Sequence, residues 1–358
     1  MKFIIRFFAW TVVSLLFVSY SAGYIPPSVS VIFSLAGLGF PYIWITVLIL
    51  FPILLMTRIK WLAFISLAIL GITSPVFMHH FGVQLNHEKN NLPYSIYDFN
   101  TFGLRDPDTA SDQIKNQKAF HEILNKGHYS LICLQEYPMK GSKHGKFYQQ
   151  LDEGLHLPYK SLSSYYWDQK FTDYILVTAS RYLILDEKIF SYDSLNFAMY
   201  SDIKFPEGVI RVYNVHFQSV KLTSERKLLM INRHIDPESA FTQMVYALKK
   251  LRTAFHHREK QAKIIAESIR SSPYPVIIAG DFNDTPVSFV YRTLKRGMRD
   301  ASTSRGFKRT YKYSRFPLQI DYILNSREIS TGNFKVINNN LSDHFAISSG
   351  FRVDTKNN

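Results

Sequence analysis

Charge is almost missing from the first 80 residues of this 358-residue sequence, and acidic residues are missing there altogether. The charged positions in that stretch are the basic residues Lys2, Arg6, Arg58 and Lys60. No residue between Phe7 and Thr57 carries a charge. Surface helices of soluble domains carry a polar face, whereas a membrane-spanning helix needs roughly 20 predominantly apolar residues. The missing charge therefore argues against ordinary buried core helices and predicts a membrane region over residues 1–80.

Cysteine is also scarce, because Cys133 in the run "LICL" is the only one. A single thiol excludes an internal disulfide and any metal site built from several cysteines. In such an apolar run a free cysteine behaves as a small buried hydrophobe. The cellular compartment stays open, since a chain without disulfides can work on either side of a membrane.

The membrane region divides into three predicted spans at about 3–22, 34–57 and 60–79. Within the longer uncharged stretch Ser28–Thr57, Gly37, Gly39 and Pro41 predict a turn or a kinked extension before the second span. The first segment also has the basic start and short apolar centre of a cleaved signal peptide. We favour a retained span, because further apolar segments follow it directly.

Basic residues predict the orientation of the spans, because cytoplasmic loops are enriched in lysine and arginine. Two of the four basic residues precede the first span, and the other two lie between the second and the third. Three spans then place the N-terminus in the cytoplasm and the chain from residue 80 onward outside. If the middle stretch does not cross, the later domain faces the cytoplasm. We expect a multi-pass membrane protein with an extracytoplasmic domain.

The remaining chain has the composition of a soluble domain. Without the first four basic residues it holds 38 basic and 28 acidic residues, a net charge of +10. Such a charge favours an anionic substrate or surface, although a basic domain can carry it for solubility alone. We predict a linker over 81–92 and one domain over 93–353.

The domain alternates between strand-like and helix-like patterns. Strands are predicted at 94–100, 129–136, 174–185, 196–205, 209–217, 275–280, 318–324 and 344–351. Apolar residues recur every three or four positions in 112–126 and in 241–270, which predicts two amphipathic helices. The basic face of the second helix could contact lipid phosphates or nucleic acid, but we favour a solvated outer face. The polar segment 219–240 is predicted to be a long loop.

Several predicted strands begin apolar and end polar. Side chains two residues apart share a face of a strand, so His216 lies on the face of Val212. The run "LICLQE" ends on Glu136, and "GDFN" points Asp281 and Asn283 the same way. Strand ends of this kind, at one rim of a sheet, would collect Asn100, Glu136, His216, Asp281, Asn283, Asp321, Asp343 and His344.

This predicted cluster combines groups that bind a metal ion with groups that transfer protons. Carboxylate and amide oxygens without cysteine suit a hard divalent ion such as Mg²⁺ or Mn²⁺. Two histidines and an aspartate supply groups that transfer protons. Each fragment alone is weak, since Gly-Asp-Phe-Asn also fits a plain turn and a histidine that closes a strand is more often structural. The prediction of a shared site therefore depends on the order and number of the fragments together.

The motifs "YDFN", "LQE", "NVHF", "GDFND", "QIDYIL" and "SDHF" occur in the order typical of the endonuclease/exonuclease/phosphatase superfamily. The chain resembles this group, which includes DNase I-like nucleases, neutral sphingomyelinases and inositol polyphosphate 5-phosphatases, over about residues 93–352. With its apolar N-terminus it looks like a bacterial, membrane-anchored member. The resemblance implies an α/β fold, a four-layer α-β-β-α sandwich of two mixed sheets with helices outside.

The resemblance also implies a metal site and an attacking water. Glu136 and Asn100 would hold Mg²⁺ or Mn²⁺, with Asp343 close to the ion. Asp281 would orient or deprotonate the water that attacks phosphorus. No covalent intermediate is expected, and the ion would offset charge on the phosphate.

The remaining site residues would bind the phosphate and the leaving group. Asn283 would hold the phosphate, and His216 and His344 would bind its oxygens and stabilise or protonate the leaving group. Asp321 would fix the tautomer of His344.

The expected partners are a phosphate ester, from nucleic acid or a phospholipid head group, and a bilayer around residues 1–80, with no obligate protein partner. Two positions depart from the family: Asp98 stands where a small residue is common, and Gln319 where an arginine is common. A catalytically silent binding module of the same fold is the main alternative. A membrane-structural protein whose domain only docks partners is a second.

Overall fold

The structure is a computed structural model, and it describes residues 2–80, 92–105, 113–139, 154–163, 173–193, 195–220, 237–302, 308–312 and 317–354. The chain forms two compact units. The first comprises Met1–Phe77, Phe217–Ile265 and Val287–Thr293, and the second comprises Met78–His216, Ala266–Pro286 and Leu294–Asn358. The predicted linker 81–92 lies outside the described residues apart from its last residue.

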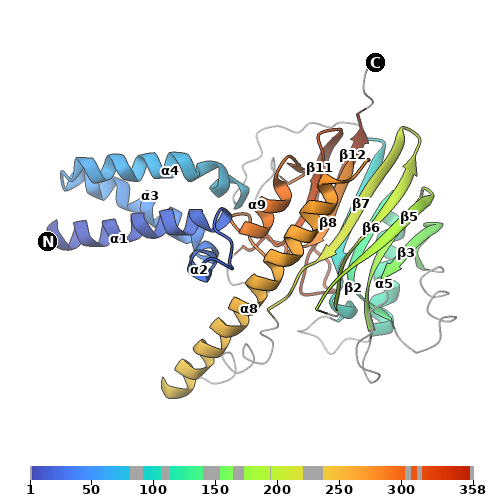
Figure 1. Cartoon of the computed structure of the whole chain (residues 1–358), viewed down its shortest axis with the longest axis horizontal. Helices are drawn as coiled ribbons and strands as arrows, with labels where there is room; N and C mark the ends of the chain where they lie inside the picture. The colour runs from blue at the N-terminus through green and yellow to red at the C-terminus, as the bar shows by residue number, and fades with distance from the viewer. Residues whose placement is uncertain are drawn as a thin grey trace. The chain divides into compact units, whose positions relative to one another are not determined.

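The N-terminal part of the first unit is built from apolar helices. These are α1 (Lys2–Tyr20), the short η1 (Ser21–Gly23), α2 (Val31–Leu38), α3 (Phe40–Met56) and α4 (Lys60–His80), shown in blue in Figure 1. Their core includes Leu16, Phe40 and Val47, all fully buried. Large apolar side chains such as Phe7 and Phe64 lie exposed on the outside of the helices. An apolar exterior over an apolar core is the pattern of a helix bundle that faces lipid.

Two of these helices, Phe3–Gly23 and Lys60–His80, are long and apolar enough to cross a membrane. The helices α2 and α3 would together make a third span, but they are bent by 66° at Gly39. The bend lies at the glycines that predicted a turn or a kinked extension, because glycine weakens a helix, and it interrupts the predicted second span over 34–57. The bent pair is either a broken span or a re-entrant loop.

The second unit is a sandwich of two six-stranded mixed sheets. The first sheet has the order β11-β12-β1-β2-β4-β3, with β1 (Tyr94–Asn100), β2 (Leu131–Met139), β3 (Tyr159–Ser163), β4 (Asp173–Ser180), β11 (Ile329–Ile337) and β12 (Ala346–Val353). The second has the order β5-β6-β7-β8-β10-β9, with β5 (Ile184–Tyr192), β6 (Leu195–Phe205), β7 (Gly208–His216), β8 (Val276–Asp281), β9 (Arg299–Asp300) and β10 (Asp321–Asn325). One central pair of each sheet is parallel, β1 with β2 and β7 with β8.

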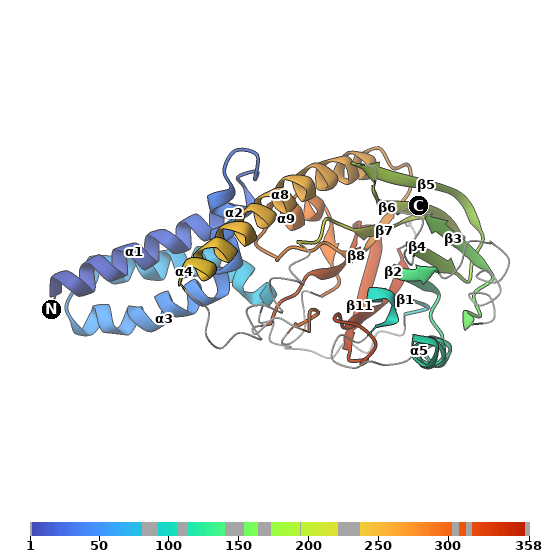
Figure 2. The ribbon, with the colours of Figure 1, turned by 90° about the horizontal axis from the view of Figure 1, so that it is seen from below.

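The core lies between the sheets and beneath the outer helices. Ile96 of the first sheet and Val212 and Ile277 of the second belong to one buried cluster. On the other face of the first sheet, Phe120 of α5 (Gln113–Gly127) packs in a second cluster. Figure 2 shows α5 end-on beside β1 and β2. The last turns of α8 (Pro237–Arg270), from Ala266 onward, belong to the same unit and pack on the second sheet, where Ser268 lies 2.7 Å from the Tyr213 hydroxyl. Helix, two sheets and helix form the four predicted layers.

Two predictions about elements need correction. The run 174–185 is not one strand, because the chain bends after Ser180 and enters the other sheet as β5. The predicted loop 219–240 is helical from Pro237, a residue well suited to the first turn of a helix because it has no N–H to leave unpaired. Residues 221–236 of that loop lie outside the described part of the chain.

Candidate active site

Strand register places three candidate residues next to one another in the second sheet. His216 ends β7 and Asp281 ends β8, and the parallel pairing of these strands sets the two residues side by side. Asp321 begins β10 and pairs with Asp281 from the other side. The polar ends of these apolar strands therefore meet at one rim of the sheet.

Gly280 permits the close approach of β7 and β8 just before the cluster. Its φ is +145°, a conformation that residues with a side chain rarely adopt. A Cβ atom at this position would lie 2.0 Å from the carbonyl oxygen of Val215. The glycine of "GDFN" is thus required by the backbone immediately before Asp281.

Glu136 reaches the site through a bulge in β2. The register with β4 shifts between Leu134 and Tyr137, and Glu136 has a φ of +47°. Its backbone carbonyl accepts a hydrogen bond from the Thr101 hydroxyl at 2.7 Å. The bulge turns the carboxylate toward the rim, where Oε1 lies 3.3 Å from Nε2 of His216.

Asn100 joins the two sheets at this rim. Its Nδ2 donates a hydrogen bond to Oδ2 of Asp281 at 3.0 Å, from the end of β1 to the end of β8. Asn283 adds two more, from its backbone N–H to Oδ1 at 2.7 Å and from Nδ2 to Oδ2 at 2.9 Å. Three hydrogen bonds thus hold the Asp281 carboxylate in one orientation.

The fixed Asp281 carboxylate also lies near both histidines. Its Oδ2 is 3.8 Å from Nε2 of His216 and 3.7 Å from Nε2 of His344. Burial raises the pKa of Asp281 to about 6, and the charge of Asp321 acts in the same direction, whereas both histidines and the Asn100 hydrogen bond lower it. The group is therefore ionised at neutral pH but close to its titration range.

His344 is held by Asp321. Its Nδ1 lies 3.1 Å and 3.0 Å from the two carboxylate oxygens, and both side chains are buried. The ring of Tyr311 meets the imidazole edge-on at 5.2 Å. Burial alone would lower the pKa of His344, but the negative charges of Asp321 and Asp281 and the Asp321 hydrogen bond together raise it well above its usual value. This histidine is poised to carry a proton on Nε2.

Asp343 precedes His344 at the same rim. Burial raises the pKa of its carboxyl group, and the negative charge of Glu136 contributes in the same direction. A hydrogen bond from the Ser342 hydroxyl to Oδ1 at 3.3 Å partly opposes this. A buried carboxyl group beside the negative charge of Glu136 forms an environment that a cation would stabilise.

All eight residues predicted from the sequence therefore lie in one connected cluster. Their direct contacts run from Glu136 through His216 and Asp281 to Asn100, Asn283 and His344, and from His344 to Asp321, with Asp343 adjacent. Among the described residues, the ligand atoms of Asp281, Asp321 and His344 all lie within 4.8 Å of one another and could hold a metal ion.

Sequence reasoning missed a polar layer beneath the cluster. Nε2 of Gln135 donates a hydrogen bond to Asp98 on the neighbouring strand and another to Asn214 of the opposite sheet, each at 2.8 Å. Burial raises the pKa of Asp98 well above its usual value. Thr310 was also missed, although its hydroxyl accepts the backbone N–H groups of Ile320 and Asp321. The alternation of polar residues along the strands could have indicated the first group, and nothing in the sequence marked Thr310.

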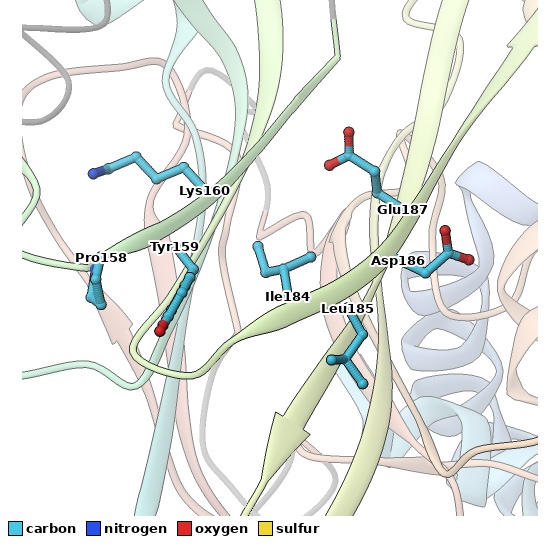
Figure 3. A pocket seen from close by; sticks show the side chains of 7 residues that line it. All are labelled: Pro158, Tyr159, Lys160, Ile184, Leu185, Asp186 and Glu187. Carbon is cyan, nitrogen blue, oxygen red and sulfur yellow. The ribbon is translucent and has the colours of Figure 1, made fainter.

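A separate pocket of about 420 Å³ lies between β3 and β5. It is lined by Pro158, Tyr159, Lys160, Ile184, Leu185, Asp186 and Glu187, drawn in Figure 3. None of these described residues belongs to the cluster at the sheet rim. The pocket is open and carries no histidine beside its acidic groups, so the rim cluster remains the better candidate for catalysis.

Comparison with solved structures supports the fold. The chain is similar to an endonuclease/exonuclease/phosphatase from Beutenbergia cavernae DSM 12333, with 14% identity over 73% of this chain and 71% of that one, at a TM-score of 0.51. It is also similar to an endonuclease/exonuclease/phosphatase family protein from Leptotrichia buccalis C-1013-b, with 15% identity over 72% of this chain and 99% of that one, at a TM-score of 0.52. At such identities the likeness concerns the fold.

Two family models match separate parts of the chain, one the apolar N-terminal region and one the domain that follows it. A model described as a domain of unknown function matches residues 2–80. No curated protein matches the chain. The model of the endonuclease/exonuclease/phosphatase family matches residues 99–344, a range that spans more than half of the chain and all eight residues of the cluster. With the sandwich and its rim cluster, this match shows that the chain belongs to the endonuclease/exonuclease/phosphatase family.

Proposed function

We propose that the protein is a membrane-anchored, divalent-metal-dependent phosphoesterase that hydrolyses its substrate by direct attack of water. The observation that carries the proposal is the fixed Asp281 carboxylate, which three hydrogen bonds orient while two histidines lie within 4 Å. An oriented carboxylate between two histidines supplies both a proton acceptor and proton donors.

The residues at the rim fit a hard divalent cation. Glu136 and Asn100 would hold Mg²⁺ or Mn²⁺, with Asp343 close by, since the ion would offset the burial and the Glu136 charge that together raise the pKa of Asp343. The group formed by Asp281, Asp321 and His344 suits a metal less well, because His344 is engaged by Asp321 and its pKa favours the protonated form, which cannot bind a metal. A bound ion would offset negative charge on the phosphoryl oxygens.

Asp281 would act on the attacking water. At neutral pH its carboxylate is ionised and can accept a proton as the oxygen of the water bonds to phosphorus. Asn100 and Asn283 fix its position before the substrate arrives. Such prior orientation removes part of the entropic cost of reaching the transition state.

The histidines would serve the phosphate and the leaving group. His344, kept protonated by Asp321, can donate a proton to the leaving oxygen as its bond to phosphorus breaks. His216 would bind a phosphate oxygen, with Asn283 holding another. The proton taken by Asp281 and the proton given by His344 balance the hydrolysis.

We further propose that residues 1–80 anchor the protein as a multi-pass membrane protein with its catalytic domain outside the cytoplasm. The two apolar helices and the bent pair support the anchoring, and the positions of the four basic residues support the orientation. A phosphodiester or phosphomonoester of a nucleic acid or of a phospholipid head group suits the net charge of +10 on the rest of the chain.

A substrate panel tests the proposal. The full chain, purified in detergent, should be assayed with Mg²⁺ or Mn²⁺ on double-stranded DNA, RNA, sphingomyelin, phosphoinositides and a chromogenic phosphodiester. We expect turnover of at least one substrate, its loss on chelation with EDTA, and its return when the metal is restored. A natively folded chain that binds one of these molecules and turns over none of them is the catalytically silent module instead.

A further inference from the structure

The first half of α8 exposes an apolar stripe. Phe241, Met244 and Leu248 are 64%, 51% and 41% exposed and follow one another at spacings of three and four residues, so they share one side of the helix. The same stripe continues to Phe255, which is 1% exposed. The side of α8 that is buried in its second half is therefore uncovered in its first half.

Basic residues border this stripe. Lys249 and Arg252, both exposed, lie one and four residues beyond Leu248 and so fall on one flank of the apolar side. Lys250 lies on the opposite side, with its ammonium 4.8 Å from the ring centre of Tyr246. An exposed apolar stripe flanked by basic residues is the pattern of a helix that lies in the surface of a membrane.

A second observation links α8 to the apolar helices. The backbone N–H and the hydroxyl of Ser28, in the turn that follows α1, donate hydrogen bonds of 2.7 Å and 2.8 Å to the Glu259 carboxylate of α8. Glu259 is 3% exposed, and the Lys263 ammonium lies 2.5 Å from it. Both Ser28 and the first part of α8 belong to the compact unit that contains α1, α2 and α3.

We propose that residues 241–252 of α8 form a membrane-surface helix. The apolar stripe would enter the boundary between head groups and acyl chains of the bilayer that holds the apolar helices, and Lys249 and Arg252 would contact anionic lipid phosphates. The proposal rests on the proposed membrane anchoring and is independent of the catalytic activity.

A second copy of the chain is the rival occupant of the stripe, because spacings of three and four also mark a coiled-coil seam. The exposed part of the stripe ends before Phe255, however, and a coiled coil is indicated only by about three to four sustained heptads. The short stripe, its basic flank and the link to the turn after α1 favour the bilayer.

Single-cysteine labelling tests the proposal in the full chain. Cys133 is fully buried, and burial raises its pKa well above the usual value, so the native thiol should stay unlabelled. Labelling of the unsubstituted chain is the control for this. Met244→Cys and Leu248→Cys place a fluorophore on the stripe, and Lys250→Cys is the matched control on the opposite side. Each labelled chain is placed in lipid nanodiscs that contain spin-labelled phospholipid as a quencher.

The proposal predicts that lipid quenches the labels at 244 and 248 at least about threefold more than the label at 250, as for an interfacial helix. Replacing Lys249 and Arg252 by glutamine should weaken this quenching in discs with anionic lipid and leave it unchanged in zwitterionic discs. Equal quenching at all three positions, or cross-links between copies at Met244→Cys without lipid quenching, would overturn it. A chain that alkaline carbonate washes from the membrane contradicts the anchoring itself, and the surface helix with it, whatever the activity shows.

Discussion

At the scale of residues, the site depends on the fixed orientation of the Asp281 carboxylate. Hydrogen bonds from Asn100 and Asn283 fix both of its oxygens, and the histidines approach from neighbouring elements. The types of these residues could be predicted from the sequence, because carboxylates and histidines at strand ends are visible there. The pairings could not, since the Asn100–Asp281 hydrogen bond joins residues far apart in the chain.

The two histidines should each matter to turnover. His216→Ala and His344→Ala are each expected to lower kcat by about 10² or more, the scale of lost proton transfer. The measurement is steady-state kinetics on the best substrate of the panel, with His256→Ala in α8 as the matched control. A loss below about threefold in both site variants would remove these residues from the mechanism.

The buried charge of Lys308 should lower the free energy of unfolding at neutral pH. The residue is 2% exposed, and burial lowers its pKa from 10.5 to about 8, an effect that Asp300 partly opposes. Between pH 8 and pH 10.5 the unfolded chain holds a proton that the folded chain has lost, so stability rises with pH in this window. Below pH 8 both states are protonated, and the folded state carries the full penalty of a buried charge.

Lys308→Met should therefore stabilise the protein at pH 7, by up to about 3 kcal/mol, with a smaller gain near pH 10. Thermal unfolding of the detergent-solubilised variant and parent at both pH values measures this. Lys335→Met, at an exposed lysine, is the control. No gain at pH 7, or a larger gain at pH 10, would contradict the argument.

At the scale of elements, the sequence predicted the inner strands and missed the edges. The inner strands of the two sheets, β12, β1, β2 and β4 in one and β6, β7, β8 and β10 in the other, all overlap predicted runs, although most bounds differ by one to three residues. The edges β11, β3 and β9 were missed, and most of β5 with them. Edge strands bury little surface, as the mostly exposed β5 illustrates, so their sequences lack the apolar run that identifies a strand.

The backbone before Asp281 gives a prediction at this scale. Gly280→Ala should destabilise the domain by about 3 kcal/mol or more, because the new methyl group would overlap the Val215 carbonyl and the residue would keep an unfavourable φ. Gly208→Ala is the matched control, since Gly208 has a φ of +146° but no atom near its Cβ position. Unfolding midpoints separate the two effects. Equal losses in the two variants would show that the contact with Val215 costs nothing.

At the scale of the whole molecule, composition alone predicted an apolar N-terminal region followed by a charged domain. The absence of acids before Glu88 predicted an apolar N-terminal region, and helices apolar enough to cross a membrane lie there. The bent pair α2–α3 decides the topology, because three crossings place the domain outside the cytoplasm and two place it inside. The orientation of the domain follows from that crossing and stays a prediction.

Topology can be measured by labelling cells with an impermeant maleimide. Lys335→Cys, on the exposed part of β11, should react in intact cells, whereas Thr57→Cys should react only after lysis. Thr57→Cys keeps all four basic residues that set the orientation. Labelling of Thr57→Cys in intact cells, with Lys335→Cys protected, would reverse the topology.

The central claim is that two sheets bring distant residues together into one metal-dependent site. Its most direct test compares Glu136→Gln with Glu187→Gln, an exposed glutamate of β5 outside the rim cluster, in turnover with Mg²⁺ and in thermal unfolding. Glu136→Gln is predicted to lower turnover by about 10² or more with an unchanged melting curve. Losing a residue that only supports a metal ligand already lowers activity by roughly 10- to 100-fold, and weakening the ligand itself should cost at least as much. Glu187→Gln should keep its activity. Full turnover by a natively folded Glu136→Gln chain would contradict the account.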